Sequence, residues 1–320
     1  MTRYFVRRVL LLIPTMIGVT FLVFLLVRII PGGAAAALLG EGATKQQVAQ
    51  VKHQLGLDQP LVTQYFKWIG SVLQGDLGRS VQTHNLIRHD ISTRIGWTFE
   101  LGLFALLFSL LIALPVGILA AIKQDTLLDY IARSAAIAFL AIPGFWLATL
   151  LIVYGATGVP LGFTTFHFTP PLGSEINKSL SANLQLIVPP AIILGIGLTG
   201  SVMRLTRTQM LEVMRQDYIR TASAKGLRLN VIIARHALRN AFIPVITIIG
   251  LQVPVLVGGS VVLEQIFSLP GMGQYLIIAI NQRDFTIIQG VVLISAAIVI
   301  VSNLVVDFVY PLLDPRIRYA

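Results

Sequence analysis

The chain has 320 residues, of which 55% are hydrophobic and only 12% are charged, and its formal net charge is +10. A soluble domain carries about 25% charged residues, so this composition excludes an ordinary soluble domain and favours a protein of the lipid bilayer. The basic residues flank apolar runs instead of gathering in a polar domain, which argues against a nucleic-acid-binding protein. The absence of cysteine excludes disulfides, thiolate metal ligands and cysteine nucleophiles.

The first apolar run covers residues 9–30 and follows three arginines within the first eight residues. It is long enough to cross a hydrocarbon core of about 30 Å as a helix. It is too long for the hydrophobic region of a cleavable signal peptide, and no small-residue cleavage site closes it. We therefore expect a transmembrane helix over residues 1–30, which Pro31, Gly32 and Gly33 bring to an end.

Residues 31–96 mix polar and apolar side chains with Gly and Pro punctuation. Thr44 is placed to cap a helix that runs to Leu55, with Gln47 as its capping-box partner. A second short helix is expected over residues 62–73, with the aromatic anchors Tyr65, Phe66 and Trp68. We interpret this segment as a small extracytoplasmic or interfacial insert.

Five more apolar spans follow, and each contains or adjoins a proline. Such residues are tolerated in membrane helices because neighbouring helices satisfy the freed backbone groups. The sequence therefore predicts an all-α membrane protein with six transmembrane helices, in which residues 97–310 form a five-helix domain and residues 311–320 a tail. The loop at 155–183 matches no motif. The five spans cover residues 99–122, 130–154, 184–205, 242–267 and 285–310.

The distribution of Lys and Arg predicts the orientation of these spans. With the N-terminus inside, 15 of the 24 Lys and Arg residues lie in the cytoplasm. Most of the others belong to the long segment 28–94, which carries little weight in this rule, and the two short outer loops keep only Lys178 and Arg283. Both termini are therefore expected in the cytoplasm.

The longest polar interruption in the C-terminal two-thirds of the chain runs over residues 217–244, and most of it belongs to a polar loop at 206–241. Met210, Leu211, Met214 and Tyr218 recur at helical spacing, and Gly226 is expected to end or bend that helix. A second helix at about residues 230–240 would complete a hairpin with small residues at its elbow, which would allow another surface to approach closely. The alternative is a solvated loop whose cations only enforce topology, and the pattern alone leaves both interpretations open.

The segment RTASAKG at 220–226 resembles the EAA loop of ABC importer permeases. It departs from the general consensus, because Arg220 occupies the acidic position and HALR at 236–239 occupies the I-x-L-P position. It is closer to the dipeptide/oligopeptide/nickel branch, which resembles YIRTAxAKG followed by RHALRNA. The resemblance extends over nearly the whole chain through LGLDQP at 55–60, GDLGRS at 75–80, IPGFW at 142–146 and the C-terminal region from VLEQIFSLPGMGQYL to DPRIRY.

This resemblance implies the type I ABC importer permease fold and a place in the plasma (inner) membrane of a bacterium or archaeon. It also implies a second, homologous permease subunit, two cytoplasmic ATPase subunits and an extracytoplasmic solute-binding protein as partners in the membrane lipid. The cargo would be di- or oligopeptides, with nickel, glutathione or oligosaccharide as alternatives. The residues of the ATPase-coupling loop would be Asp217, Tyr218, Arg220, Thr221, Ala222, Ala224, Lys225, Gly226, Arg235, His236 and Arg239.

The chain itself is expected to be a transport subunit and no enzyme. It contains no G-x-x-x-x-G-K-[ST] phosphate loop, so ATP and Mg²⁺ would bind to the partner subunits, and the chain would hold no cofactor or metal. Neither G-x-S-x-G nor H-E-x-x-H occurs, which disfavours an intramembrane hydrolase. A stand-alone secondary transporter would show inverted repeats and buried charges along its spans, and we find neither pattern.

Three acidic residues lie in or at the edges of the predicted spans, namely Glu100, Glu264 and Asp307. Ionisable residues at membrane depth are candidates for function. Glu100 and Asp307 are expected to face headgroups or water. Glu264 is the strongest candidate for lining the translocation path, where it would accept a peptide ammonium group.

Overall fold

The structure is a computed structural model that describes residues 2–29, 39, 44–54, 56–161, 164–166, 168 and 180–313. The predicted helix stop at 31–33, the end of the tail and about half of the 155–183 loop lie outside the described residues. The chain folds as two compact units, the first made of Met1–Trp97 with Pro270–Leu304, and the second of Thr98–Leu269 with Val305–Ala320.

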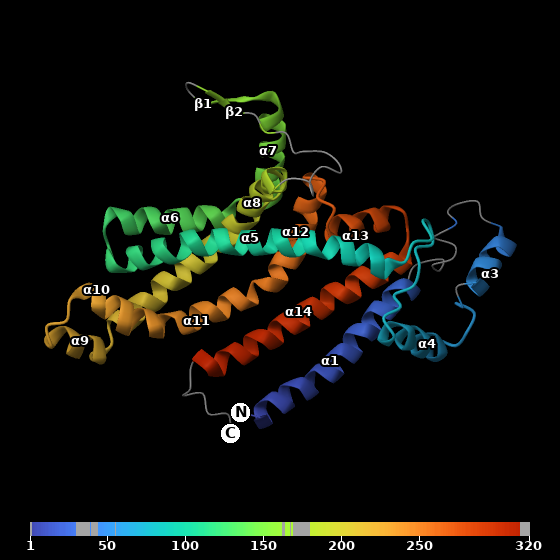
Figure 1. The fold of residues 1–320 in the computed structure, drawn as a ribbon, viewed down its shortest axis with the longest axis horizontal. Coiled ribbons are helices and arrows are strands. Elements are labelled where there is room, and N and C mark those ends of the chain that lie inside the picture. The colour runs from blue at the N-terminus through green and yellow to red at the C-terminus, as the bar shows by residue number, and fades with distance from the viewer. Residues whose placement is uncertain are drawn as a thin grey trace. The chain divides into compact units, whose positions relative to one another are not determined.

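The first unit contains two membrane-length helices and several shorter ones (Figure 1). Its elements are α1 (Thr2–Arg28), α3 (Lys45–Gln54), α4 (Leu61–Leu73), the first turns of α5 (Ile87–Ile122), α13 (Met272–Asn281) and most of α14 (Phe285–Leu313). The predicted capping box of α3 is confirmed, because the Thr44 backbone N–H donates to Gln47 Oε1 over 2.9 Å and the Gln47 N–H donates to Thr44 Oγ1 over 3.3 Å. Tyr65 and Trp68 of α4 pack against Phe24 of α1.

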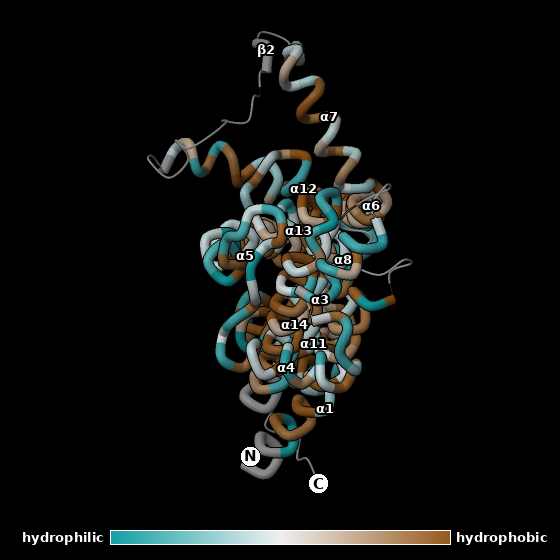
Figure 2. Tube along the Cα trace, turned by 90° about the vertical axis from the view of Figure 1, so that its right-hand side faces the viewer, coloured by the Kyte–Doolittle hydropathy of each residue, from teal (hydrophilic) through white to brown (hydrophobic). Residues whose placement is uncertain are grey.

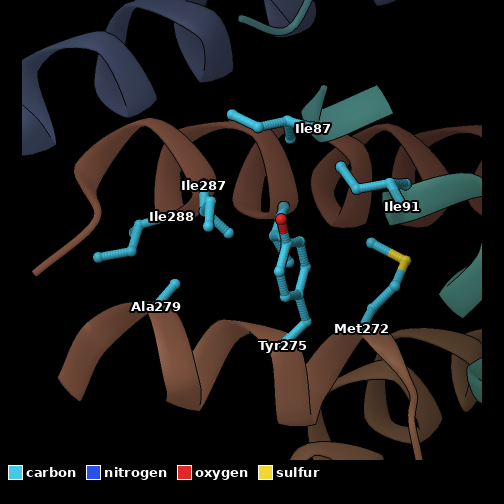
Figure 3. Close-up of a cluster of buried hydrophobic side chains, with 8 residues drawn as sticks. Ile87, Ile91, Met272, Tyr275, Ala279, Ile287 and Ile288 are labelled. Carbon is cyan, nitrogen blue, oxygen red and sulfur yellow. The ribbon is translucent and has the colours of Figure 1, made fainter. Parts of the chain in front are cut away.

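An aliphatic core holds α5, α13 and α14 together within the first unit. Figure 3 shows Tyr275 of α13 among the isoleucines of α5 and α14. The Tyr275 hydroxyl donates a hydrogen bond of 2.8 Å to Asp90, and the Arg94 guanidinium lies 4.5 Å from the centre of the Tyr275 ring. Burial, followed by this hydrogen bond, raises the pKa of Tyr275 above its usual value. Tyr275 is therefore a neutral donor across the physiological pH range.

A buried carboxylate also fixes the loop that precedes α5. Asp284 is fully buried, and its Oδ2 accepts hydrogen bonds from the Ser80 hydroxyl over 2.6 Å and from the Val81 N–H over 2.9 Å. Its Oδ1 accepts from the N–H of Ile287 over 3.2 Å. The loop and the start of α14 are thus joined by one side chain, which the sequence pattern did not single out.

The second unit is built around α8, the long helix that contacts α6, α7, α11 and α12 (Figure 1). Its strands β1 and β2 pair antiparallel, with Val159 opposite Phe166. Its elements are the remainder of α5, α6 (Leu127–Ala141), α7 (Gly144–Thr157), β1 (Val159–Leu161), β2 (Thr164–Phe166), α8 (Leu180–Met214), α9 (Asp217–Ala224), α10 (Leu229–Val231), a π-helix (Ile232–Ala237), α11 (Leu238–Leu251), α12 (Val253–Ile266) and the end of α14.

Two glycines of α8 allow this helix to approach its neighbours closely. A Cβ atom on Gly195 would lie 2.7 Å from the Ala105 carbonyl oxygen of α5, and one on Gly200 would lie 2.7 Å from the Ala136 carbonyl oxygen of α6. Real Cβ atoms do not approach backbone oxygens so closely. The close packing of α8 on α5 and α6 therefore depends on these two glycines.

Among the described residues, five helices are long and apolar enough to cross a membrane, and the count becomes six if the bent pair α6 and α7 forms one span. The chain bends by 85° between these two helices, and Pro143 lies at the break, directly before α7. Large apolar side chains are exposed on the helix surfaces, for example Leu111 at 75% and Ile137 at 64%. Figure 2 shows hydrophobic residues along α1, α11 and α14. These observations confirm the predicted all-α, multi-span membrane architecture.

The predicted span at 242–267 is wrong in its bounds. The helical segment that includes α10, the π-helix and α11 runs continuously over Leu229–Leu251, and α12 begins only after Gln252. Pro254 lies in the first turn of α12, where its missing N–H costs nothing. No Gly or Pro separates Leu229 from Ala241, so the second helix of the predicted hairpin continues directly into the membrane helix.

Candidate coupling site

The candidate site is the helical hairpin formed by α9, α10, the π-helix and the first turns of α11. The helix α8 ends at Met214 and α9 begins at Asp217, so the single helical face predicted across residues 210–218 is interrupted. Gly226 ends α9, as predicted, and has a φ of +78°. The N–H of Gly226 donates to the Ser223 carbonyl over 2.9 Å and that of Leu227 donates to the Ala222 carbonyl over 3.4 Å. This is a Schellman motif, which fixes the direction of the chain after α9.

The inner face of the hairpin is an apolar cluster. Ile219 and Ala222 of α9 are buried, with 5% and 7% of their surface exposed. They pack with Met210 of α8 and with residues of the π-helix and α11, and Ala121 at the end of α5 joins the same cluster. The small side chain at position 222 therefore packs inside the hairpin, whereas the sequence pattern predicted small residues at the elbow that another surface approaches.

The outer face of the hairpin is polar and basic. Asp217 and Arg220 form an ion pair of 3.5 Å, but their side chains are 96% and 76% exposed, so the pair contributes little to stability. Among the predicted coupling residues the structure buries only Ala222 and half-buries His236. The others are exposed, namely Asp217, Tyr218, Arg220, Thr221, Ala224, Lys225, Gly226, Arg235 and Arg239.

Polar side chains connect the two arms of the hairpin. The Asn240 side-chain amide donates a hydrogen bond of 2.8 Å to the Tyr218 hydroxyl and one of 3.3 Å to the carbonyl oxygen of His236. His236 and Arg235 lie in the π-helix, a rare local widening that is frequent at functional sites. The first arm is thus attached to the helix that leads directly into the membrane.

A buried ion pair holds the end of α8 against α6. Asp129 is fully buried, and Arg207 donates to both of its oxygens over 2.6 and 2.8 Å. The backbone N–H of Asp125 also donates to Asp129 over 3.0 Å. Sequence reasoning missed this pair, although an acidic residue in the first turn of an apolar helix is a recognisable signal. The pair fixes the helix from which the hairpin emerges.

The three acidic candidates lie in different environments. Glu264 of α12 is fully buried, and its Oε1 accepts a hydrogen bond of 2.8 Å from the Thr98 hydroxyl. Glu100 is half-buried and accepts a hydrogen bond of 3.2 Å from the Asn183 amide. Asp307 is also half-buried. The structure does not bring these carboxylates together into one site.

The apolar helices and the exposed basic hairpin define a multi-pass helical membrane protein. The chain belongs to the family of binding-protein-dependent transport system inner membrane components, whose model matches residues 113–319. The model of the N-terminal region of the same components matches residues 1–99. The protein is therefore a multi-pass protein of the inner membrane, as predicted.

Several named permease proteins are similar to the chain over its whole length. The dipeptide transport system permease protein DppB of Alkalihalophilus pseudofirmus is 39% identical, with 100% of each chain covered. The di/tripeptide transport system permease protein DppB of Pseudomonas aeruginosa is 40% identical, with 100% of this chain and 99% of the relative covered. The oligopeptide transport system permease protein AppB of Bacillus subtilis is 37% identical, with 100% of each chain covered.

Proposed function

We propose that this chain is the membrane-spanning permease subunit of an ATP-driven importer that moves di- or oligopeptides from a solute-binding protein into the cytoplasm. The names of the relatives support a peptide cargo and do not favour the nickel, glutathione or oligosaccharide alternatives. In this proposal a second, homologous permease completes the pathway. Two ATPase subunits bind ATP and Mg²⁺ and carry out hydrolysis, so this chain is not an enzyme.

The main support for the proposal is the hairpin, which has an apolar inner face and a basic, exposed outer face. Its apolar inner face attaches it to the ends of α5 and α8, and its second arm is continuous with α11. Its outer face presents a set of exposed cations that the hairpin does not use for its own packing. A hairpin built in this way moves together with the membrane helices. A closing motion of a bound ATPase would therefore tilt those helices as a rigid body.

The proposed orientation places the hairpin and both termini in the cytoplasm. It is supported by the excess of Lys and Arg in residues 204–239 and at the N-terminus. The same orientation places residues 31–96 on the outer side, where the solute-binding protein would deliver its cargo. The domain bounds at 97–310 and 311–320 remain a prediction.

Glu264 remains the proposed acidic group of the translocation path. Its burial and its hydrogen bond with Thr98 mean that it would meet a peptide ammonium group only in a conformation in which α12 separates from the start of α5. A change of conformation during each cycle is the basis of alternating access.

The test is reconstitution of the complete importer, with its partner permease and ATPases, into liposomes supplied with the solute-binding protein. ATP-dependent uptake of a labelled dipeptide, which unlabelled peptide abolishes and excess nickel or glutathione does not, is the expected result. Uptake by this chain alone, without ATPase subunits, would contradict the proposal. So would uptake of nickel or glutathione in place of the peptide.

A further inference from the structure

A cleft of about 540 Å³ opens within the first unit, and its walls come from α1, α4, the loop after α4 and the start of α14. It lies in the part of the chain that the proposed coupling mechanism does not use. The residues that matter for the argument are Arg28, Gln64, Lys67, Trp68, Asp76 and Gln289.

Among the described residues, Arg28 is held at the edge of this cleft by neutral groups. Its Nε donates to Gln64 Oε1 over 3.3 Å, its Nη1 donates to the Phe24 carbonyl over 3.0 Å, and its guanidinium carbon lies 3.6 Å from the centre of the Phe24 ring. In the described part of the chain no carboxylate forms an ion pair with Arg28, and its Nη2 has no hydrogen-bond partner. A cation fixed by neutral groups retains donors for an anion.

Gln289 also lines this cleft. Only 8% of its surface is exposed, and its Nε2 is buried without a hydrogen-bond partner among the described residues. Gln64 is equally buried, but it accepts from Arg28 and donates to the Gln59 carbonyl over 2.7 Å. A buried amide without a partner is unfavourable, so an acceptor from outside the described chain is expected at Gln289.

The cleft lies at the ends of two helices that are long and apolar enough to cross a membrane. The span Arg7–Arg28 ends at one of its walls and the span Phe285–Phe308 begins at another. The helix α4 lies alongside, with Leu61, Val62, Phe66 and Leu73 between 55% and 81% exposed and Trp68 in the cleft wall. Exposed apolar residues with an aromatic anchor are typical of a helix that lies in the membrane interface.

We propose that this cleft binds one phospholipid, whose phosphate oxygens accept hydrogen bonds from Arg28 Nη2 and Gln289 Nε2. At this depth the phosphate of a lipid headgroup is the abundant anion. Lys67 and Asp76 line the same cleft with opposite charges, which leaves the charge of Arg28 for the phosphate. The lipid would connect α1 with α4 and α14 inside the first unit.

Native mass spectrometry of the complete importer, released from nanodiscs of phosphatidylethanolamine and phosphatidylglycerol, tests this site. The unmodified complex is expected to retain one tightly bound phospholipid. Gln289→Leu and Arg28→Gln are each expected to reduce its retention about tenfold, the usual effect of losing a hydrogen bond to a charged group. Lys52→Gln, which changes an exposed cation on α3, is the matched control and should retain the lipid.

If the Arg28→Gln complex assembles poorly, the Gln289→Leu variant still tests the site. This variant removes only an unpaired buried amide, so its melting temperature is expected to be unchanged or raised. A titration with inorganic phosphate separates the two possible sources of the anion. Failure of phosphate to displace the lipid supports the lipid site. Displacement by phosphate, or equal retention in all variants, would overturn the proposal.

Discussion

The side-chain amide of Asn240 donates a hydrogen bond of 2.8 Å to the hydroxyl of Tyr218, and this contact joins the first arm of the exposed hairpin to the helix that enters the membrane. The two residues are 22 positions apart, and both belong to the second unit. The helix α11 belongs to a candidate membrane span. This hydrogen bond therefore links α9, which a partner protein could contact, to a helix that would tilt in the membrane.

Removal of this bond should loosen the first arm without unfolding the hairpin. Tyr218→Phe deletes only the hydroxyl, and a hydrogen bond of this kind contributes about 1 kcal/mol net. Hydrogen exchange at the α9 amides is therefore expected to accelerate about fivefold, measured by mass spectrometry on the purified complex. Tyr154→Phe, at an exposed tyrosine of α7, is the control and should leave α9 unchanged. Equal exchange rates in Tyr218→Phe and the unmodified protein would show that the bond is not important in solution.

Ala222 and Ala224 offer a matched pair, because one is buried and the other exposed on the same short helix. Ala222→Glu places a charge in the apolar cluster and is expected to destabilise the hairpin by several kcal/mol, so that less complex assembles. Ala224→Glu should change the stability by less than about 0.5 kcal/mol. It should, however, lower the ATPase activity that the solute-binding protein stimulates. Thermal unfolding and ATPase assays on both variants distinguish packing from docking. Normal stimulated ATPase activity in Ala224→Glu would contradict a role of this surface in coupling.

We expect the removal of both charges of the Asp129–Arg207 ion pair to destabilise the protein less than the removal of the Asp129 charge alone. Asp129→Leu leaves Arg207, which is partly buried, and Arg133, which lies 3.6 Å from Asp129, without their carboxylate. It is expected to lower the free energy of unfolding by about 3–5 kcal/mol. The double variant Asp129→Leu with Arg207→Met removes both charges and should recover most of that loss. Melting temperatures of the complex in one detergent provide the comparison. A double variant that is less stable than the single one would argue against this account.

Glu264 can be tested separately for structure and for transport. Glu264→Gln keeps an acceptor for Thr98 but removes the charge, whereas Thr98→Val removes the hydrogen bond and keeps the charge. If the carboxylate receives a peptide ammonium group, Glu264→Gln should reduce dipeptide uptake at least tenfold with little change in melting temperature. Thr98→Val should instead lower the melting temperature and affect uptake less. If Glu264→Gln lowered the melting temperature and left dipeptide uptake unchanged, Glu264 would have a role in packing alone.

Hydropathy predicted the multi-span helical architecture because the bilayer requires long apolar helices, although it misplaced the span at 242–267. The capping box of α3 was predicted from two residues three positions apart. The Asp129–Arg207 contact could not be predicted in the same way, since its partners are 78 positions apart and meet only through the packing of α6 on α8. The burial of Ala222 was also inaccessible to sequence reasoning. A small residue suits both a tight elbow and a packed interior, and only the position of the neighbouring helices decides between them.

The absence of cysteine makes a direct test of the hairpin possible, because any introduced cysteine is unique in this chain. Arg220→Cys and Lys225→Cys place a thiol on the exposed hairpin, and Lys52→Cys places one on α3 as a control. Thiol cross-linking in the assembled importer is predicted to join both hairpin variants to the ATPase subunit, with a yield that changes when ATP is added, and to leave the Lys52→Cys variant unlinked. A cross-link from Lys52→Cys to the ATPase, with none from the hairpin, would contradict the proposal that this hairpin couples ATP hydrolysis to transport.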